Sequence, residues 1–238
     1  MSAKLVIIPT LNEVENIEKI VMSVFALHAD FSILVVDDQS NDGTQAIVKQ
    51  LAANHKELFY IFRNGKKGLG RAYVTGFKWA LQEDYDYIFQ MDADFSHDPK
   101  DLVKLYKACH ESNFDMTIGS RYVKGVNVVN WPMKRILLSW FASKYVKFIT
   151  GMPIEDATAG FVCYRKRVLE NFDLDKIKFI GYAFQIEMKY KVYLSKFSMK
   201  EVPVIFTDRE KGKSKMNTKI INEAIIGVLK LKLQKFKI

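Results

Sequence analysis

The 238-residue sequence predicts an α/β fold in which a mostly parallel, Rossmann-like sheet is flanked by helices. In the first half, short apolar runs alternate with longer segments of helical periodicity, which is typical of parallel strands joined by helical crossovers. Each of three polar motifs directly follows one of these apolar runs. Right-handed crossovers place the carboxyl ends of such strands at one edge of the sheet, where ligands bind in folds of this kind. We therefore expect a ligand site at that edge.

The expected elements follow in order from aliphatic and aromatic runs of strand length and from longer stretches with helical spacing. In the first half, strands are expected at residues 5–8, 33–36, 58–62 and 87–91, and helices at about 14–27, 44–53 and 70–81. In the less regular second half, strands are expected at 117–122, 159–164 and 200–206, and helices at 133–149 and 182–194. A basic stretch and a final amphipathic helix over about 217–238 follow. Because no repeat, low-complexity tract or linker interrupts the chain, we expect residues 1–238 to form one domain.

Composition and charge narrow the classes of function. Hydrophobic residues make up 49% of the sequence, enough for a sizeable core. Cys109 and Cys163 lie far apart, and the first predicted strand begins too early for a targeting peptide to precede it, so we expect reduced thiols in the cytoplasm. No apolar run is long enough to predict a membrane span. The net charge of +9 favours an anionic partner, and without a zinc-finger spacing or a ribonucleoprotein motif we do not expect nucleic acid.

Two carboxylates follow the apolar strand that ends at Met91. Asp92 and Asp94 are spaced i, i+2, and carboxylates are costly to bury without a partner. Two hard oxygen ligands at this spacing suit one Mg²⁺ or Mn²⁺ ion, whose other positions go to water and phosphate oxygens. A diphosphate held on such an ion is a good leaving group. The pair alone is a weak signal, because acidic pairs in loops are common and most are only solvated.

A series of ordered motifs covers nearly the whole chain. They are Ile7-Ile-Pro-Thr-Leu-Asn-Glu13, Val35-Val-Asp-Asp-Gln-Ser-Asn-Asp-Gly-Thr44, Gly68-Leu-Gly-Arg-Ala72, Met91-Asp-Ala-Asp-Phe-Ser-His-Asp-Pro99, Gly119-Ser-Arg-Tyr122, Asp156-Ala-Thr-Ala-Gly-Phe161, Phe184-Gln-Ile-Glu187 and Arg209-Glu-Lys-Gly-Lys-Ser-Lys215. Together they resemble the family 2 glycosyltransferases with the GT-A fold, and among these the dolichol- and polyprenyl-phosphate mannosyltransferases. The resemblance implies an inverting enzyme that moves a hexose, with GDP-mannose the favoured donor, to a polyprenyl phosphate.

The resemblance also implies roles for individual residues. The nucleotide sugar is expected to contact strand ends and a C-terminal loop, at Pro9, Leu11, Glu13, Val36, Asp38, Asp92, Ala93, Asp94, Arg209 and Lys215. Asp94 is expected to be the main ligand of Mg²⁺ or Mn²⁺, with Asp92 beside it. Arg121 and Arg135 are expected to hold the acceptor phosphate. Some relatives have a third metal ligand, Gln, at the position that Ser96 occupies here.

Asp156 separates two interpretations of the acceptor. In relatives that glycosylate hydroxyl groups, an acidic residue in this region is the general base, whereas a lipid phosphate is already ionised at neutral pH and needs no base. Transfer to a phosphate depends on placing its oxygen in line with the sugar C1 and on neutralising the departing diphosphate. Asp156 is kept as a secondary member of the candidate catalytic set, beside Asp92, Asp94, Arg121 and Arg135, because only a hydroxyl acceptor would need it as a base.

Simpler structural interpretations exist for several of these residues. Asn12 could cap the first helix and Asp42 the second, and most single arginines and basic runs lie on solvated surfaces. Gln185 and Glu187 stand two residues apart on a predicted helix and therefore do not face one way.

Other functions stay open at this point. The donor could be UDP-glucose or a UDP-N-acetylhexosamine, and the acceptor could be a saccharide hydroxyl. A nucleotidyltransferase also uses an aspartate–metal site, but it usually has a Gly-rich basic loop after the first strand, and residues 9–13 form none. The last alternative is a non-catalytic binding module. The sequence argues against it because it keeps the candidate catalytic and diphosphate-binding residues Asp92, Asp94, Arg209 and Lys215.

Two helices are candidates for contact with a membrane surface. Residues 217–238 predict a basic amphipathic helix, and the helix at 133–149 carries Phe141 and Phe148 beside Lys144 and Lys147. The alternative is that both helices pack on the domain. We expect a protein that associates peripherally with the cytoplasmic face of a membrane. A membrane-anchoring partner subunit is a further candidate partner.

Overall fold

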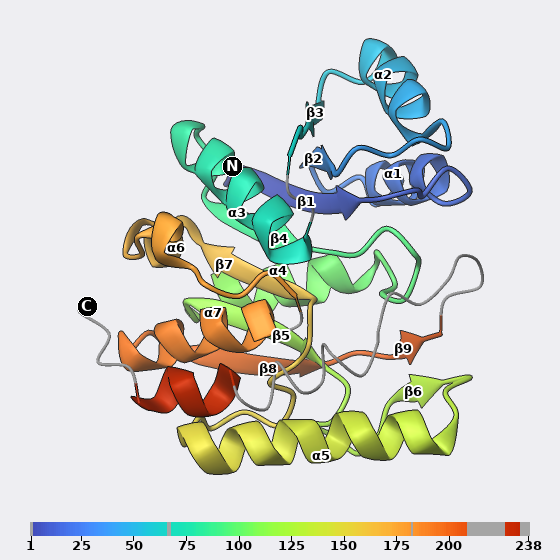
Figure 1. The fold of residues 1–238 in the computed structure, drawn as a ribbon. Helices are drawn as coiled ribbons and strands as arrows, with labels where there is room; N and C mark the ends of the chain where they lie inside the picture. Colours follow the sequence, from blue (N-terminus) through green and yellow to red (C-terminus); the bar gives the residue numbers. More distant parts are fainter. Residues whose placement is uncertain (1, 66–67, 182, 209–226, 234–238) are drawn as a thin grey trace.

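The computed structural model describes residues 2–65, 68–181, 183–208 and 227–233 (Figure 1). Its centre is a seven-stranded sheet in the order β3-β2-β1-β4-β7-β5-β8. These strands are β1 (Lys4–Thr10), β2 (Phe31–Asp37), β3 (Leu58–Phe62), β4 (Tyr87–Gln90), β5 (Met116–Ser120), β7 (Val162–Arg165) and β8 (Met199–Pro203). β7 is antiparallel to β4 and β5, and the other neighbouring pairs are parallel. The predicted mostly parallel α/β fold is confirmed.

Helices cover both faces of this sheet (Figure 1). One face packs against α3 (Leu69–Gln82), α5 (Met133–Thr150) and α7 (Ala183–Leu194), and the other against α1 (Ile17–Phe25), α2 (Thr44–Asn54) and α4 (Asp101–His110). Leu5 and Ile7 face the first group, whereas Val6 and Ile8 face the second. The central strands are unbroken apolar runs because both of their faces are buried.

Four shorter elements complete the described part of the chain. They are β6 (Val128–Val129), α6 (Lys166–Glu170), a 3-10 turn η1 (Leu174–Lys176) and β9 (Phe206–Thr207). β6 and β9 pair with each other in a separate two-stranded sheet. The predicted strand at 200–206 is therefore wrong in one respect, because the chain leaves the main sheet after Pro203 and re-pairs at Phe206. Of the predicted final helix, residues 227–233 are helical and the rest lies outside the described residues.

The antiparallel strand β7 brings a distant motif to the ligand edge of the sheet. Gln90, the last residue of β4, pairs with Val162, the first residue of β7, and Val162 also pairs with Ile118 near the end of β5. Because β7 starts where its neighbours end, the segment before it, residues 156–161, lies beside the residues that follow β4 and β5. This register explains why β7 begins later than the predicted strand at 159–164.

Candidate active site

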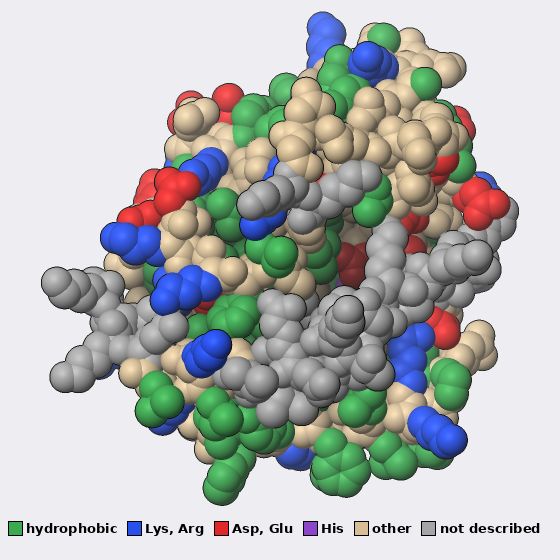
Figure 2. All heavy atoms as spheres, viewed as in Figure 1, with side chains coloured by type: hydrophobic (Ala, Val, Ile, Leu, Met, Phe, Trp, Pro, Cys, Tyr) green, Lys and Arg blue, Asp and Glu red, His purple; other side chains and the backbone are tan. Residues whose placement is uncertain are grey.

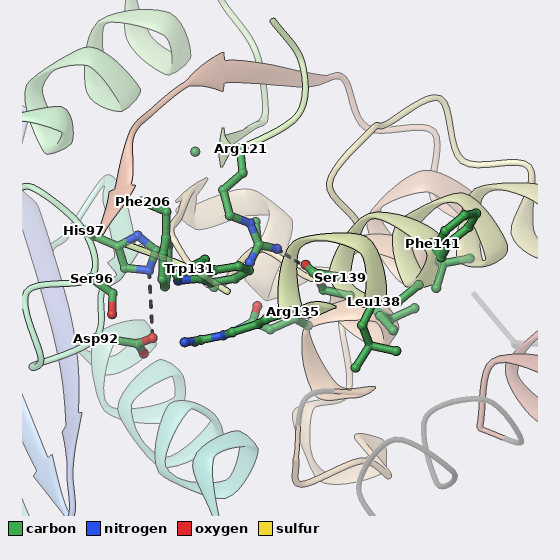
Figure 3. Close-up of a pocket in the computed structure, with 18 of the residues that line it drawn as sticks. Asp92, Ser96, His97, Arg121, Trp131, Arg135, Leu138, Ser139, Phe141 and Phe206 are labelled. Atoms are coloured by element: carbon green, nitrogen blue, oxygen red, sulfur yellow. Dashed lines mark hydrogen bonds and ion pairs between the residues drawn. The ribbon is translucent and has the colours of Figure 1, made fainter. Parts of the chain in front are cut away.

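A pocket of about 490 Å³ lies at this edge of the sheet. Four of the candidate residues line it: Asp92, Asp94, Arg121 and Arg135. Figure 3 shows Asp92 at one end of the group, the two arginines with Trp131 in the middle, and Leu138 and Phe141 on α5 at the other end. The pocket therefore runs from an acidic end past two cations to an apolar end.

The acidic end is built on the loop that follows β4. Asp94 is 8% exposed, and its Oδ1 accepts a hydrogen bond from the backbone N–H of Ser96 at 3.1 Å. The hydroxyl of Tyr73 on α3 donates to Asp92 Oδ1 at 3.4 Å. In the described part of the chain, no set of three His, Cys, Asp or Glu side chains could hold a metal ion alone. Two carboxylates on one pocket nevertheless suit a Mg²⁺ or Mn²⁺ ion that takes its other ligands from phosphate and water.

His97 is a pocket residue to which the sequence motif gave no role. It is 3% exposed, and its ring lies 4.7 Å from the ring of Phe161 and 5.0 Å from that of Phe206. Burial lowers its pKa to about 4, so the imidazole is neutral at pH 7. Its Nε2 lies 3.8 Å from Asp92 Oδ2, and neither ring nitrogen has a hydrogen-bond partner among the described residues. The sequence signal that could have identified His97 as a site residue was its position within the motif from Met91 to Pro99.

Arg121 and Asp156 form a buried, bidentate pair. Arg121 donates from Nε to Asp156 Oδ2 at 2.7 Å and from Nη2 to Oδ1 at 2.6 Å, and its backbone N–H also reaches Oδ2 at 3.0 Å. Burial alone would raise the pKa of Asp156, but the charge and hydrogen bonds of Arg121 bring that pKa below its ordinary value. Asp156 is fully buried and does not line the pocket. It acts on the pocket by fixing Arg121, and its geometry does not support the general-base interpretation.

The second candidate arginine, Arg135, lies in the first turn of α5. Arg135 donates from Nη1 to Asp208 Oδ1 at 2.6 Å. Its guanidinium carbon lies 4.0 Å from the ring centroid of Trp131, and that of Arg121 lies 5.5 Å from the same centroid. Both cations are thus held at defined places beside one indole ring.

The candidate nucleotide residues at or after the ends of β1, β2 and β4 do not line this pocket, apart from Asp92 and Asp94. Pro9, Leu11, Glu13, Val36, Asp38 and Ala93 are not among the residues that line it. The Val36 side chain is buried in the core, which leaves only its backbone for contact with a ligand. Asp38 accepts from the backbone N–H of Gly68 at 2.8 Å and pairs with Arg63. Arg209 and Lys215 lie outside the described residues.

Hydrogen bonds tie the loops after β1 and β2 together. Buried Asp37 accepts from Thr10 Oγ1 at 2.8 Å, and Asn12 Oδ1 accepts from the backbone N–H of Asn41 at 3.0 Å. The interpretation of Asn12 as a helix cap is therefore wrong, because its side chain bridges two loops and α1 begins only at Ile17. Asp42 accepts from the backbone N–H groups of Thr44, the first residue of α2, and of Val14, each at 3.0 Å, so it supports the start of α2 although the N-cap position itself is Gly43.

The two candidate polar residues of α7, Gln185 and Glu187, face different ways, as predicted. Gln185 lines the pocket. Glu187 instead accepts hydrogen bonds at 3.0 Å from the backbone N–H groups of Lys178 and Phe179. Burial raises the pKa of Glu187, and these bonds oppose that shift. Glu187 therefore stabilises the segment before α7, and only Gln185 belongs to the site.

Comparisons with known proteins agree with this architecture. Residues 5–172 match the sequence model of glycosyl transferase family 2. The chain is 45% identical over 225 residues to a polyprenol monophosphomannose synthase of Mycolicibacterium smegmatis, a match that covers 94% of this chain and 84% of the relative. It is 40% identical over 224 residues to an undecaprenyl-phosphate mannosyltransferase of Micrococcus luteus, covering 94% and 91%.

Two solved structures share the fold at low sequence identity. One is a glucosyl-3-phosphoglycerate synthase of Mycobacterium tuberculosis in complex with Mn²⁺, UDP and glucosyl-3-phosphoglycerate, with a TM-score of 0.64, 14% identity, and coverage of 97% of this chain and 80% of the other. The second is a mannosyltransferase of Pyrobaculum calidifontis with GDP-Man and Mn²⁺, with a TM-score of 0.60, 15% identity, and coverage of 98% and 71%. The predicted GT-A fold is confirmed.

Proposed function

We propose, since the chain belongs to glycosyl transferase family 2, that it transfers mannose from GDP-mannose to a polyprenyl phosphate with inversion at C1. The observation that carries this proposal is the order in which acidic, basic and apolar side chains line one pocket. Carboxylates, two arginines and an apolar end follow one another (Figure 3). A lipid phosphate has the matching order, an anionic head followed by an apolar chain. The names of the two relatives, which specify mannose and a polyprenyl acceptor, support the same assignment.

The acceptor phosphate is proposed to lie against Arg121 and Arg135. Guanidinium groups suit phosphate because they carry a permanent positive charge and several N–H donors. Asp156 and Asp208 hold the two cations in place, so little ordering remains when the phosphate arrives. The phosphate oxygen is already ionised, so positioning supplies the nucleophile without proton removal.

The donor diphosphate is proposed to lie at the acidic end of the pocket. Asp94, with Asp92 beside it, would hold Mg²⁺ or Mn²⁺, which neutralises charge on the departing diphosphate. Mn²⁺ in the two related structures supports a divalent ion here. We further propose that Pro9, Leu11, Glu13 and Asp38, with the backbone at Val36 and Ala93, contact the nucleoside, and that the basic loop with Arg209 and Lys215 contacts the diphosphate.

The apolar end of the pocket is continuous with exposed apolar side chains on α5. Met133 is 67% exposed and Phe148 86%, and Phe141, which lines the pocket, is 59% exposed. In Figure 2 such side chains gather along the edge formed by α5, with basic side chains among them. Lys144 and Lys147 pair with Glu155, so exposed Lys134 is the better candidate for contact with anionic lipid.

No helix in the described ranges is long and apolar enough to cross a membrane. We propose that α5 lies on the cytoplasmic surface of a membrane and that the lipid enters the pocket from there. Long lysine side chains can remain at the surface while apolar neighbours enter the lipid. A membrane-anchoring partner subunit would add to this contact and remains a proposal.

A donor and acceptor panel tests the proposed function. GDP-mannose, UDP-glucose and UDP-N-acetylglucosamine would each be offered with undecaprenyl phosphate, dolichyl phosphate or free mannose, in Mg²⁺ or Mn²⁺. We expect transfer of mannose to the lipid phosphates, and none by the Asp94→Ala control. Preference for a UDP-sugar would overturn the donor assignment, and transfer to free mannose without transfer to lipid phosphate would overturn the acceptor assignment.

A further inference from the structure

Trp131 occupies the space around which both candidate phosphate-binding arginines are arranged. It lies in the connection between β6 and α5, and its side chain lines the pocket (Figure 3). The guanidinium carbons of Arg135 and Arg121 lie 4.0 and 5.5 Å from its ring centroid, within the range of cation–π attraction. Two like charges repel each other, and an indole face attracts both. The ring therefore fixes where the two cations stand relative to each other.

Further contacts hold the Trp131 ring and the two arginines beside it. Phe206 packs edge-on against it with ring centroids 5.1 Å apart at an angle of 74°. Asp156 and Asp208 hold Arg121 and Arg135. The indole is thus in contact with Phe206 and with two guanidinium groups, each of which is held in turn by a carboxylate.

The indole N–H is the unused group of this arrangement. Trp131 Nε1 is buried and has no hydrogen-bond partner among the described residues. A buried donor that is left unpaired is unfavourable, because it has lost its hydrogen bond to water without gaining another. Indole N–H is a donor only, so the group that satisfies it must be an acceptor such as a phosphate oxygen. The pocket then offers three donor groups, two guanidinium groups and one indole N–H.

We propose that Trp131 is an acceptor-binding residue, whose Nε1–H donates to an oxygen of the acceptor phosphate while its ring positions Arg121 and Arg135. This inference rests on the proposed use of a phosphate acceptor and adds a third contact to that site. The N–H contributes a directional hydrogen bond beside two charge contacts, and it favours an acceptor whose phosphate oxygens can reach all three donors.

Two substitutions separate the two roles. Trp131→Phe keeps an aromatic ring for the arginines and removes the N–H, whereas Trp131→Leu removes both. Trp140→Phe is the matched control, since Trp140 lies on α5, packs against Phe141 with ring centroids 5.0 Å apart, and is not among the residues that line the pocket. Acceptor KM and kcat would be measured with varied undecaprenyl phosphate, and the affinities for GDP and for dodecyl phosphate by calorimetry.

We expect Trp131→Phe to raise the acceptor KM and the dissociation constant for dodecyl phosphate roughly 10-fold or more, the loss typical of a hydrogen bond to a charged group. Trp131→Leu should lose more, and both variants should keep the parent's GDP affinity. Trp140→Phe should match the parent. Parent-like acceptor constants for Trp131→Phe, or equal losses for GDP and acceptor, would overturn the inference. If the parent binds dodecyl phosphate more tightly than Trp131→Phe but does not glycosylate lipid phosphate, the proposed function fails and the phosphate contact of Trp131 stands.

Discussion

Lys189 on α7 is a fully buried lysine directly behind the pocket, and it yields a quantitative prediction. Its Nζ donates to the carbonyl oxygen of Ala159 at 2.6 Å and more weakly to that of Gln185 at 3.4 Å. Burial lowers its pKa from 10.5 to about 7, an effect opposed by the charges of Asp156 and Glu201 and reinforced by Arg121. The folded protein therefore holds this amine in its charged form only at a cost in stability.

The pH dependence of this cost follows from the two pKa values. Below pH 7 the amine is protonated in both folded and unfolded chains, so the full penalty is present. As the pH rises from 7 towards 10.5, the unfolded chain binds more protons than the folded one, so the free energy of unfolding increases. The full span corresponds to roughly 5 kcal/mol, of which roughly 3 kcal/mol falls between pH 6 and pH 9.

Lys189→Met removes the titration and keeps a side chain of similar length. The variant should be more stable than the parent at pH 6, and its advantage should shrink by roughly 3 kcal/mol at pH 9. Urea unfolding followed by circular dichroism at both pH values measures this difference. Exposed Lys107 on α4 provides the control, because Lys107→Met should show no such change with pH. A Lys189→Met advantage that is the same at pH 6 and pH 9 would refute the reasoning.

Four further predictions concern the site and its surroundings. Asp94→Ala should abolish transfer in Mg²⁺ and shift Tm by only a few degrees, since Ser96 loses one hydrogen bond; turnover in EDTA equal to that in Mg²⁺ would contradict it. Asp156→Asn should lower the free energy of unfolding by about 3–5 kcal/mol, because it leaves Arg121 buried without its carboxylate; near-parent urea stability would contradict it. Arg121→Ala and Arg135→Ala should each raise acceptor KM roughly 10- to 150-fold and spare GDP affinity in calorimetry, with the reverse result reassigning them to the donor. Phe148→Glu should weaken sedimentation with anionic vesicles without changing GDP affinity, and unchanged sedimentation would remove α5 from the membrane surface.

Local sequence patterns predicted most of the first half of the fold. The strand at 58–62 was placed with its observed ends, and the helix at 44–53 within one residue, because apolar runs and helical spacing are local properties. Helix α4 was not predicted. Its buried residues Leu102, Leu105 and Cys109 have helical spacing, but charged and polar residues separate them over a short length. Such a helix is stabilised by its contact with the sheet more than by its own sequence.

The pairing of Arg121 with Asp156 depends on the register of β7, which no local sequence pattern predicts. Sequence motifs named Arg121 and Asp156 separately, Arg121 as a contact of the acceptor phosphate and Asp156 as a secondary candidate that only a hydroxyl acceptor would need as a base. In the structure 35 residues separate them along the chain, and the antiparallel pairing of β7 with β4 and β5 brings them into contact. The contact changes the role of Asp156 from a candidate base to the group that fixes Arg121.

This change bears on the choice between a phosphate and a hydroxyl acceptor. Transfer to a hydroxyl requires a group that accepts its proton near neutral pH. Among the described residues that line the pocket, Asp92 and Asp94 stand at the proposed donor end, and His97, with a pKa of about 4, is a weak base. The other charged side chains there are the cations Arg121 and Arg135. A pocket that offers cations to the acceptor, and whose candidate base, Asp156, is already held by one of them, suits an acceptor that arrives ionised. Loss of transfer in Asp156→Asn would therefore report a displaced Arg121 and would not identify a missing base.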